Sequence, residues 1–459
     1  MELLLIAIFV LGYLAIAFEH KLHINKTAPA LIIASIMWGV WALFESDKIG
    51  IINSELSHEL ASVSQILFFL LGAMTIVEII DAHQGFKIIT NRIKTKDARK
   101  LLWIIAFISF FLSALLDNLT TAIVMVSLLR KLVHDKEQRM FFAGIVIIAA
   151  NAGGAWSPIG DVTTTMLWIG GQISSVNIIK TLLIPSIICL LVPLIIVGFK
   201  LKGEVKRDNY DYDKAEKEEK VKGSLLILIL GVAGLLFVPV FKTMTHLPPY
   251  LGMLFSLAVV WIASELLHID KEEEEKKQYS AIHALSKIDT SSVLFFLGIL
   301  LAIGVLQGIG TLSNLASLMD STIGNKDVIA VAIGLLSAVV DNVPIVAATM
   351  KMYPLATEVI NADAFNYAVA NPELVHSGSF VFNNATYYLH DAKLWEFIAY
   401  AAGTGGSCLI IGSAAGVAVM GMEKIDFIWY IKKISWLALI GYIAGAIAYM
   451  ALYPMFAAH

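Results

Sequence analysis

An apolar run from about residue 141 to residue 168 is interrupted in its middle, and this interruption restricts the fold more than any other feature of the sequence. A run of this length normally forms one membrane-spanning helix. This one contains Gly153, Gly154, Pro158 and Asp161. Glycine and proline free backbone groups that lipid cannot satisfy, so protein, water or a ligand must bind them. We therefore predict a helix that is broken within the membrane.

The broken segment is also rich in oxygen-bearing side chains. The exposed helix ends would place free carbonyls and amides beside them, which is the environment that a small cation needs. A Gly/Pro kink that serves only packing, with Asp161 at a membrane edge, is the alternative. The recurrence of the pattern later in the chain favours the ion site. Its first candidate residues are Asn151, Ser157, Asp161, Thr163 and Thr164.

The composition is that of a polytopic membrane protein. The 459 residues are 58% hydrophobic, whereas soluble globular chains are about 45–50% apolar. The two cysteines, Cys189 and Cys408, both lie in apolar runs, which disfavours a disulfide framework and a thiolate metal site. The sequence lacks HExxH, Gly-x-Ser-x-Gly and nucleotide-binding motifs. We therefore expect no enzyme, no cofactor and no nucleic-acid partner.

Apolar runs predict ten crossings, two of them broken helices. Two further apolar stretches, 101–129 and 327–352, each carry Asp-Asn in the middle. The predicted crossings are 3–18, 28–44, 61–80, 141–168 (broken), 177–199, 224–241, 249–267, 291–309, 396–421 (broken) and 434–456.

The basic residues indicate that both extra stretches are re-entrant hairpins. Lys and Arg favour cytoplasmic loops. Both flanks of 101–129 are strongly basic, whereas 327–352 has only Lys326 before it and Lys351 after it. Each stretch should therefore enter and leave on one side, the first from the cytoplasm and the second from outside. Both termini are then external, and only six of the 33 basic residues lie outside, namely Lys48, Lys180, Lys242, Lys326, Lys351 and Lys393.

The stretches between the spans divide the chain. Residues 201–222 mix charges of both signs and predict a cytoplasmic linker between the regions 1–200 and 223–459. Part of the less hydrophobic segment 353–394 is expected to form an amphipathic helix on the external surface. Several histidines fall in loops without ligand spacing and are interpreted as solvated, namely His134, His246, His268, His283, His376 and His390.

Three motifs occur twice in the same order. Leu-Phe-Phe-Leu at residue 67 returns at residue 294, Ser113 to Asn118 returns as Ser337 to Asn342, and Gly153 to Asp161 returns as Gly405 to Ser413. Each half holds five crossings, so the second copy should be inverted in the membrane. Inverted repeats with interrupted helices mark the binding site of a secondary transporter. The predicted fold is an all-α polytopic membrane protein of two such repeats, each with a hairpin and a broken helix.

The hairpin tips carry acids. An aspartate within a membrane is by default a functional candidate, although Asp and Asn also cap free helix amides. Asp117 and Asn118 lie in the first tip, and Asp341 and Asn342 in the second. Because Asp161 becomes Ser413 in the second copy, the first half offers two carboxylates and the second offers one. Further candidates are Thr121, Ser337, Thr404, Ser407 and Ser413, with Glu78 as an accessory vestibule residue or a membrane-edge anchor.

From about residue 60 onward these motifs resemble NhaD-type sodium/proton antiporters of the ion-transporter superfamily. The resemblance implies the same fold, a homodimer, and ion-exchange roles for the hairpin-tip and broken-helix residues. Dicarboxylate and citrate carriers of the superfamily have Ser-Asn-Thr at the tips. This chain has Asp-Asn-Leu and Asp-Asn-Val, and two acids would repel an anion. The residues it implicates are Asp117, Asn118, Asn151, Asp161, Thr163, Thr164, Ser337, Asp341 and Asn342.

The leading hypothesis is an antiporter that exports Na⁺, with Li⁺ as a second candidate, in exchange for H⁺. The hard ion Na⁺ would bind oxygen ligands from Asp117, Asn118, Asn151 and Asp161. The expected partners are Na⁺, H⁺ and the lipid bilayer, in a bacterial inner membrane. A permease for arsenite or a dicarboxylate is the alternative.

Overall fold

The computed structural model describes residues 1–17, 19–22, 24–90, 93, 95–201, 203–205, 221–383 and 385–457. Most of the predicted linker 201–222 lies outside these residues. Among the described residues, eight helices are long and apolar enough to cross a membrane. The prediction of a helical, polytopic membrane protein is thereby confirmed. The structure also contains one antiparallel strand pair, β1 (Ser379–Phe382) and β2 (Ala385–Tyr388), which was not predicted.

The helices follow the apolar runs of the sequence. In chain order they are α1 (Glu2–Ala17), α2 (Glu19–Leu22), α3 (Thr27–Phe44), α4 (Ile49–Ala82), α5 (Lys87–Thr90), α6 (Ala98–Leu116), α7 (Asn118–Leu132), α8 (Lys136–Gly154), α9 (Val162–Ile169), α10 (Ser175–Lys200), α12 (Ser224–Thr245), α13 (Pro249–Leu267), α14 (Glu273–Lys277), α15 (Ala281–Lys287), α16 (Thr290–Gly308), α17 (Thr311–Thr322), α18 (Lys326–Leu336), α19 (Asn342–Met352), α20 (Ala362–Ala370), α21 (Lys393–Gly405), α22 (Ala414–Glu423), α23 (Phe427–Tyr430) and α24 (Trp436–Ala457).

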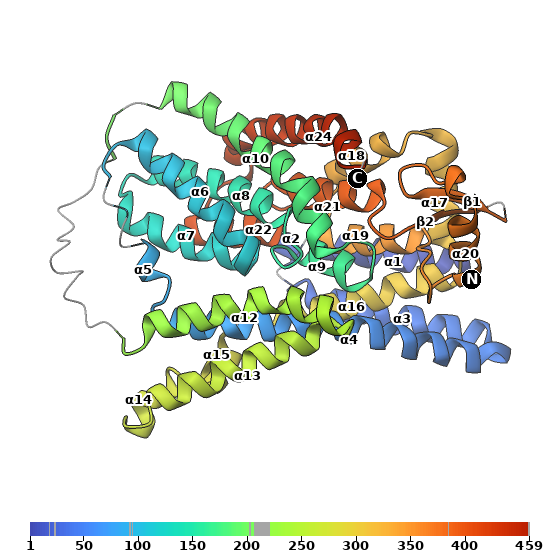
Figure 1. Cartoon of the computed structure of the whole chain (residues 1–459), viewed down its shortest axis with the longest axis horizontal. Coiled ribbons are helices and arrows are strands. Elements are labelled where there is room, and N and C mark those ends of the chain that lie inside the picture. Colours follow the sequence, from blue (N-terminus) through green and yellow to red (C-terminus); the bar gives the residue numbers. More distant parts are fainter. Residues whose placement is uncertain are drawn as a thin grey trace.

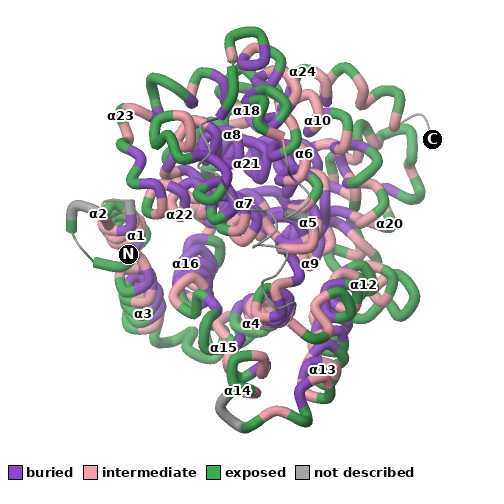
Figure 2. The backbone as a smooth tube through the Cα atoms, turned by 90° about the vertical axis from the view of Figure 1, so that its left-hand side faces the viewer, coloured by how far each residue is buried: buried purple, intermediate pink, exposed green. Residues whose placement is uncertain are grey.

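These helices form two groups that lie against each other (Figures 1 and 2). The lower group in Figure 1 contains α1, α3, α4, α12, α13 and α16, and the upper group contains the remaining long helices. The most extensive packing occurs within groups, as between α3 and α16 below and between α6 and α8 above. The upper group therefore brings both Asp-Asn stretches and both glycine-rich breaks into one body.

The helices end at the predicted interruptions. α6 and α7 meet at Asp117, and α18 and α19 flank a short segment that ends at Asp341. The chain leaves helical conformation between Gly154 and Val162, and again between Gly405 and Ala414. Glycine, proline and serine are poor continuers of a helix, and Asp161 and Ser413 cap the helices that follow.

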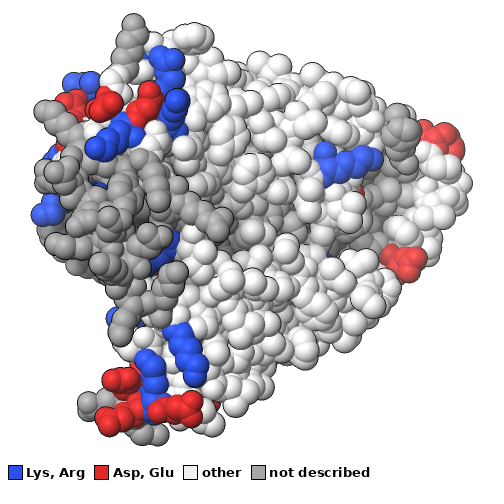
Figure 3. Space-filling view, turned by 60° about the vertical axis from the view of Figure 1, so that its left-hand side comes forward, with Lys and Arg blue, Asp and Glu red and all other residues white. Residues whose placement is uncertain are grey.

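Charged side chains gather at the two ends of the molecule. On the face shown in Figure 3, Lys, Arg, Asp and Glu lie mainly at one end, with a few at the other and a broad uncharged band between them. The N-terminus lies away from the end that carries α5 and α14 (Figure 1). An uncharged band is what a bilayer requires of the surface that it covers.

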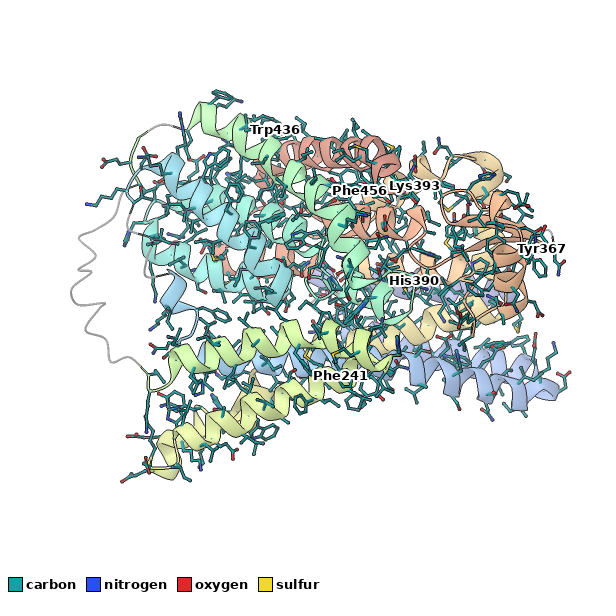
Figure 4. All side chains as sticks on the ribbon, viewed as in Figure 1. Phe241, Tyr367, His390, Lys393, Trp436 and Phe456 are labelled. Carbon is teal, nitrogen blue, oxygen red and sulfur yellow. The ribbon has the colours of Figure 1, made fainter. Side chains whose placement is uncertain are left out.

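Two predictions about loops need adjustment. The amphipathic helix expected within 353–394 is the nine-residue α20, and the segment also holds the strand pair, with Phe380 buried against Ala364 and Ala368. Tyr367 of α20 projects at the end of the molecule far from α14 (Figure 4). The prediction that His268 is solvated is wrong, because its side chain is 1% exposed.

Candidate functional site

Asp117 joins the two helices of the first hairpin. Its φ of 109° is rare for a residue with a side chain. Its backbone N–H donates to the carbonyl of Ser113 at the end of α6. Its side chain accepts from Thr120 at the start of α7, from the backbone N–H at 2.7 Å and from the hydroxyl at 2.9 Å. The carboxylate thus caps the hairpin tip, and such local strain is commonly retained where function requires it.

Asn118 connects the hairpin tip to the first broken helix. Its Nδ2 donates to Oδ1 of Asn151 at 3.0 Å and to Oδ2 of Asp161 at 2.6 Å. Asp161 also caps α9 by accepting from the backbone N–H and the hydroxyl of Thr163, each at 2.8 Å. These four side chains are buried. Residues from three separate elements therefore meet at the start of α9, where the helix dipole favours negative charge.

The second half completes this cluster. Nδ2 of Asn151 donates to the hydroxyls of Ser407 at 2.9 Å and Ser413 at 3.0 Å. Nδ2 of Asn342 lies 3.5 Å from Oδ1 of Asp161. The amide of Asn151 in the first broken helix thus contacts two hydroxyls of the second one. The site is thus formed by both halves of the chain, and we call this set of side chains around Asp161 the central cluster.

Matching contacts hold the two hairpins against the two broken helices. The Ser113 hydroxyl donates to the carbonyl of Ala150 at 2.6 Å, and the Ser337 hydroxyl donates to that of Ala402 at 2.8 Å. The Ser157 hydroxyl donates to the carbonyl of Ala114 at 2.6 Å. Ser157 and Ser337 therefore position backbone, which distinguishes them from the residues of the central cluster.

Glycines allow the backbone of each broken helix to lie close to the backbone of its hairpin. A Cβ added at Gly153 would collide with the carbonyl of Phe110, and one at Gly405 would collide with that of Gly334. Phe110 and Gly334 stand three residues before Ser113 and Ser337. The paired glycines thus provide close contact between hairpin and broken helix in both halves.

The predicted threonines differ in whether their hydroxyl groups have a hydrogen-bond partner. The Thr164 hydroxyl donates to the carbonyl of Asp161 at 2.9 Å, and that of Thr404 donates to the carbonyl of Tyr400 at 2.6 Å. The hydroxyl of Thr121 is buried and has no hydrogen-bond partner among the described residues. Its backbone N–H donates to the carbonyl of Asp117 at 3.2 Å. A buried hydroxyl without a partner is costly, so Thr121 remains a candidate ligand.

Two further predicted residues, one acid from each helix group, lie apart from the central cluster. Asp341 caps α19 by accepting from the N–H of Val343, but its other oxygen pairs with Lys26 at 3.0 Å. Glu78 lies on α4 in the lower group, and no hydrogen bond between described residues joins it to the central cluster.

Sequence reasoning missed several buried charged residues. Lys26 was assigned to a cytoplasmic loop, and no sequence pattern marked its contact with Asp341. Glu396 is fully buried and accepts from Tyr449 at 3.0 Å and from Asn177. Glu423 is paired with Arg130 and Arg139 at 2.7 Å each. An acid at the edge of an apolar run was the available signal for both glutamates.

Comparisons with known proteins show which family the chain belongs to. The family model described as a citrate transporter, CitMHS, matches residues 13–371. Sodium/proton antiporter 1 of Arabidopsis thaliana is 46% identical over 450 residues, which is 98% of this chain and 72% of that protein. Sodium/proton antiporter 2 of the same plant is 44% identical, over 97% of this chain and 98% of that protein.

A bacterial relative is more distant. The Na(+)/H(+) antiporter NhaD of Alkalimonas amylolytica is 28% identical over 468 residues, which is 96% of this chain and 88% of that protein. The family model matches more than half of the chain, and the two plant relatives are more than 40% identical over nearly all of it. The chain therefore belongs to the citrate transporter family CitMHS, and its plant and bacterial relatives carry the name sodium/proton antiporter.

Proposed function

We propose that this multi-pass membrane protein is a secondary antiporter that exchanges Na⁺ for H⁺, with Li⁺ as a second candidate ion. The observation that carries the proposal is the central cluster, in which a buried carboxylate meets amide and hydroxyl groups of both halves. Asp117 adds a second carboxylate at the neighbouring tip. Carboxylate, amide and hydroxyl oxygens are suitable ligands for a hard cation. The names of the relatives support the same chemistry.

In the proposed cycle, Na⁺ binds among Asp117, Asn118, Asn151 and Asp161. The Asn118 amide now donates to two of these side chains, and ion contacts would replace those hydrogen bonds. A carboxylate oxygen that holds a proton no longer offers a negative charge to Na⁺. The two ions therefore use the same oxygens in turn, which couples the export of one to the import of the other.

We further propose that the chain consists of two inverted repeats with re-entrant hairpins. The paired serine–carbonyl contacts and the paired glycines of the two halves support this arrangement. Alternating access would then expose the central cluster to one side at a time. Basic loops on the cytoplasmic side, both termini outside and a homodimer belong to the same proposal. The bacterial inner membrane also remains a prediction, since relatives include plant proteins.

A carrier of citrate or another carboxylate is the competing function, because the family model bears that description. Two carboxylates at the site would repel such an anion, and no Lys or Arg among the described residues forms an ion pair with Asp117 or Asp161. Arg is the usual partner of a bound carboxylate. The geometry of this site therefore favours a cation.

Purified protein in proteoliposomes tests the proposal. Addition of NaCl should release protons, reported by a pH-sensitive dye, with saturation in Na⁺ and none with choline chloride. Uptake of radiolabelled citrate or succinate without Na⁺-dependent proton movement would instead establish the competing function.

A further inference from the structure

Lys26 is in direct contact with the acid at the tip of the second hairpin. Its Nζ lies 3.0 Å from Oδ2 of Asp341, and the two side chains are only 24% and 16% exposed. The same ammonium lies over the ring of Phe295, 4.4 Å from its centroid. A carboxylate and an aromatic face both attract a cation that is partly removed from water. Lys26 is therefore part of the second tip rather than a solvated loop residue.

The residues on either side of Lys26 hold it in this position. The backbone N–H of Thr27 donates to Oδ1 of Asn25 at 2.9 Å, and the Thr27 hydroxyl donates to the carbonyl of Ser291 at 2.8 Å. The Ser291 hydroxyl in turn donates to Asn25 at 3.0 Å. These bonds attach the start of α3 to the start of α16. The lysine thus projects from a fixed point in the lower helix group towards the upper group.

The two hairpin tips differ in charge for this reason. Asp117 has hydrogen bonds from Thr120 and, among the described residues, no ion pair. Asp341 has an ion pair with Lys26. The negative charge of Asp341 in the second tip is therefore compensated by Lys26. The two acids of the first half, Asp117 and Asp161, remain available to cations.

The ion pair is also connected to the central cluster. Asp341 begins α19 by capping Val343, and Asn342, the next residue, reaches Asp161 at 3.5 Å. Movement of the tip away from Lys26 would therefore move Asn342 relative to Asp161. Lys26 acts on the site through both the charge and the position of the second tip.

We propose that Lys26 is a positioning residue for ion exchange, which neutralises Asp341 so that Asp117 and Asp161 alone alternate between Na⁺ and H⁺. This inference rests on the proposed function. Removal of the lysine charge leaves a third carboxylate charge beside the central cluster, which attracts Na⁺ and slows its release. Removal of the Asp341 charge leaves an unpaired ammonium, which repels Na⁺.

Kinetics in proteoliposomes test this inference through shifts of opposite sign. At alkaline pH, Lys26→Gln should lower the KM for Na⁺ about tenfold and lower kcat, whereas Asp341→Asn should raise that KM about tenfold, as expected for one unit charge near the ion. Asn can still cap α19. The double variant Lys26→Gln/Asp341→Asn should return the KM for Na⁺ to near the wild-type value. The charge-conserving variant Lys26→Arg should have the wild-type KM.

Lys351→Gln is the matched control. Lys351 pairs with Glu59 of α4 at 2.6 Å, with side chains 27% and 11% exposed, and also joins the two helix groups. It lies at the other end of α19, so its loss should leave the KM for Na⁺ unchanged. If Lys351→Gln shifted the KM for Na⁺ as much as Lys26→Gln does, then weaker contact between the two helix groups would be enough to change the KM. That result would overturn the proposal.

Failure of the double variant to recover would also overturn the proposal. Complete loss of exchange in both Asp341→Asn and the double variant would show that Asp341 binds the ion itself.

Size-exclusion chromatography checks that each variant is folded. If Lys26→Gln does not fold, the charge-exchanged variant Lys26→Asp/Asp341→Lys takes its place, and a KM unlike that of wild type would count against the proposal. Exchange by the wild type reports separately on the proposed function.

Discussion

At the level of single residues, the two acids of the first half use for structure the same oxygens that we propose for ion binding. Asp117 caps α7 through Thr120, and Asp161 caps α9 through Thr163. Backbone amides at the start of a helix stabilise a buried negative charge without cancelling it. This arrangement lowers the free-energy cost of a buried negative charge and fixes both carboxylates at the starts of two helices.

We expect Asp117→Asn and Asp161→Asn each to reduce Na⁺-dependent proton exchange at least about tenfold, the loss that follows removal of a charged ligand contact. Asn retains the cap acceptor, so the variants should remain folded in the membrane. Dye-reported exchange in everted vesicles measures the effect. Asp47→Asn, which alters an exposed acid between α3 and α4, is the control. Normal exchange by either site variant would contradict the proposed site.

At the level of elements, the hairpins and the broken helices fit only because glycine occupies their contacts. We expect Gly153→Ala and Gly405→Ala each to destabilise the protein by about 1–3 kcal/mol or more, because the added Cβ meets a backbone carbonyl that cannot rotate away. Thermal unfolding in detergent, followed by size-exclusion chromatography, measures the loss. A Cβ added at Gly39 in α3 would meet no atom of another segment within 4 Å. Gly39→Ala should therefore be neutral or stabilising.

A second prediction concerns the buried histidines just beyond the ends of α4 and α13. Nδ1 of His83 lies 2.8 Å from the carbonyl of Ile79, so it carries the hydrogen, and the Nε2 atoms of His83 and His268 are 3.1 Å apart. The ring of Tyr279 stacks on His268. Burial lowers the pKa of His83. Burial lowers the pKa of His268 to about 4, with smaller contributions from the repulsion that a protonated His83 would exert and from the charges of Lys271 and Lys222.

Both imidazoles are therefore neutral in the folded protein. As pH falls from about 6.5, the ordinary pKa of histidine, the unfolded segment binds protons that the folded one does not, so stability is lost progressively down to about pH 4. The protection factors of residues 264–281 in hydrogen exchange, which are corrected for the pH dependence of the intrinsic exchange rate, should thus be lower at pH 5.5 than at pH 7.5. His268→Leu should weaken this pH dependence, whereas His58→Gln at an exposed position should not. Equal protection factors at both pH values would disprove the assignment.

At the level of the whole molecule, the proposed topology places both ends of the first hairpin on one side. Lys100→Cys and Lys136→Cys, at exposed positions in the first turns of α6 and α8, should both react with an impermeant thiol reagent from the cytoplasmic side. Lys48→Cys should react from the outside. The native Cys189 and Cys408 are buried and should give little background. Labelling of positions 100 and 136 from opposite sides would exclude a re-entrant hairpin.

The charge of the site also predicts electrogenic exchange. With Lys26 compensating Asp341, two carboxylates and one Na⁺ give the loaded site one negative charge, whereas two protons leave it neutral. Exchange of two H⁺ for one Na⁺ then moves one charge, worth about 2.3 kcal/mol per 100 mV. In proteoliposomes at equal pH, a valinomycin K⁺ potential should drive Na⁺ in the direction set by its sign. Indifference to the potential would indicate one-for-one exchange.

The sequence by itself determined the helical elements and their interruptions. The length of an apolar run predicts a membrane span. Within such spans, the free-energy cost in lipid of Gly, Pro, Asp and Asn is high enough to indicate helix breaks and hairpin tips. The same reasoning identified Asp117, Asn118, Asn151 and Asp161 as ion-site candidates. These signals are local, since they depend on what each backbone segment requires of its own surroundings.

Tertiary structure alone decided which side chains meet. Asn151 reaches Ser407 and Ser413 across more than 250 residues of sequence, and Lys26 reaches Asp341 from the other helix group. Neither contact leaves a periodic or compositional trace, because long-range pairing depends on how helices pack rather than on local propensity. His268 likewise follows an ordinary helix end in the sequence and is buried only because His83 and Tyr279 cover it.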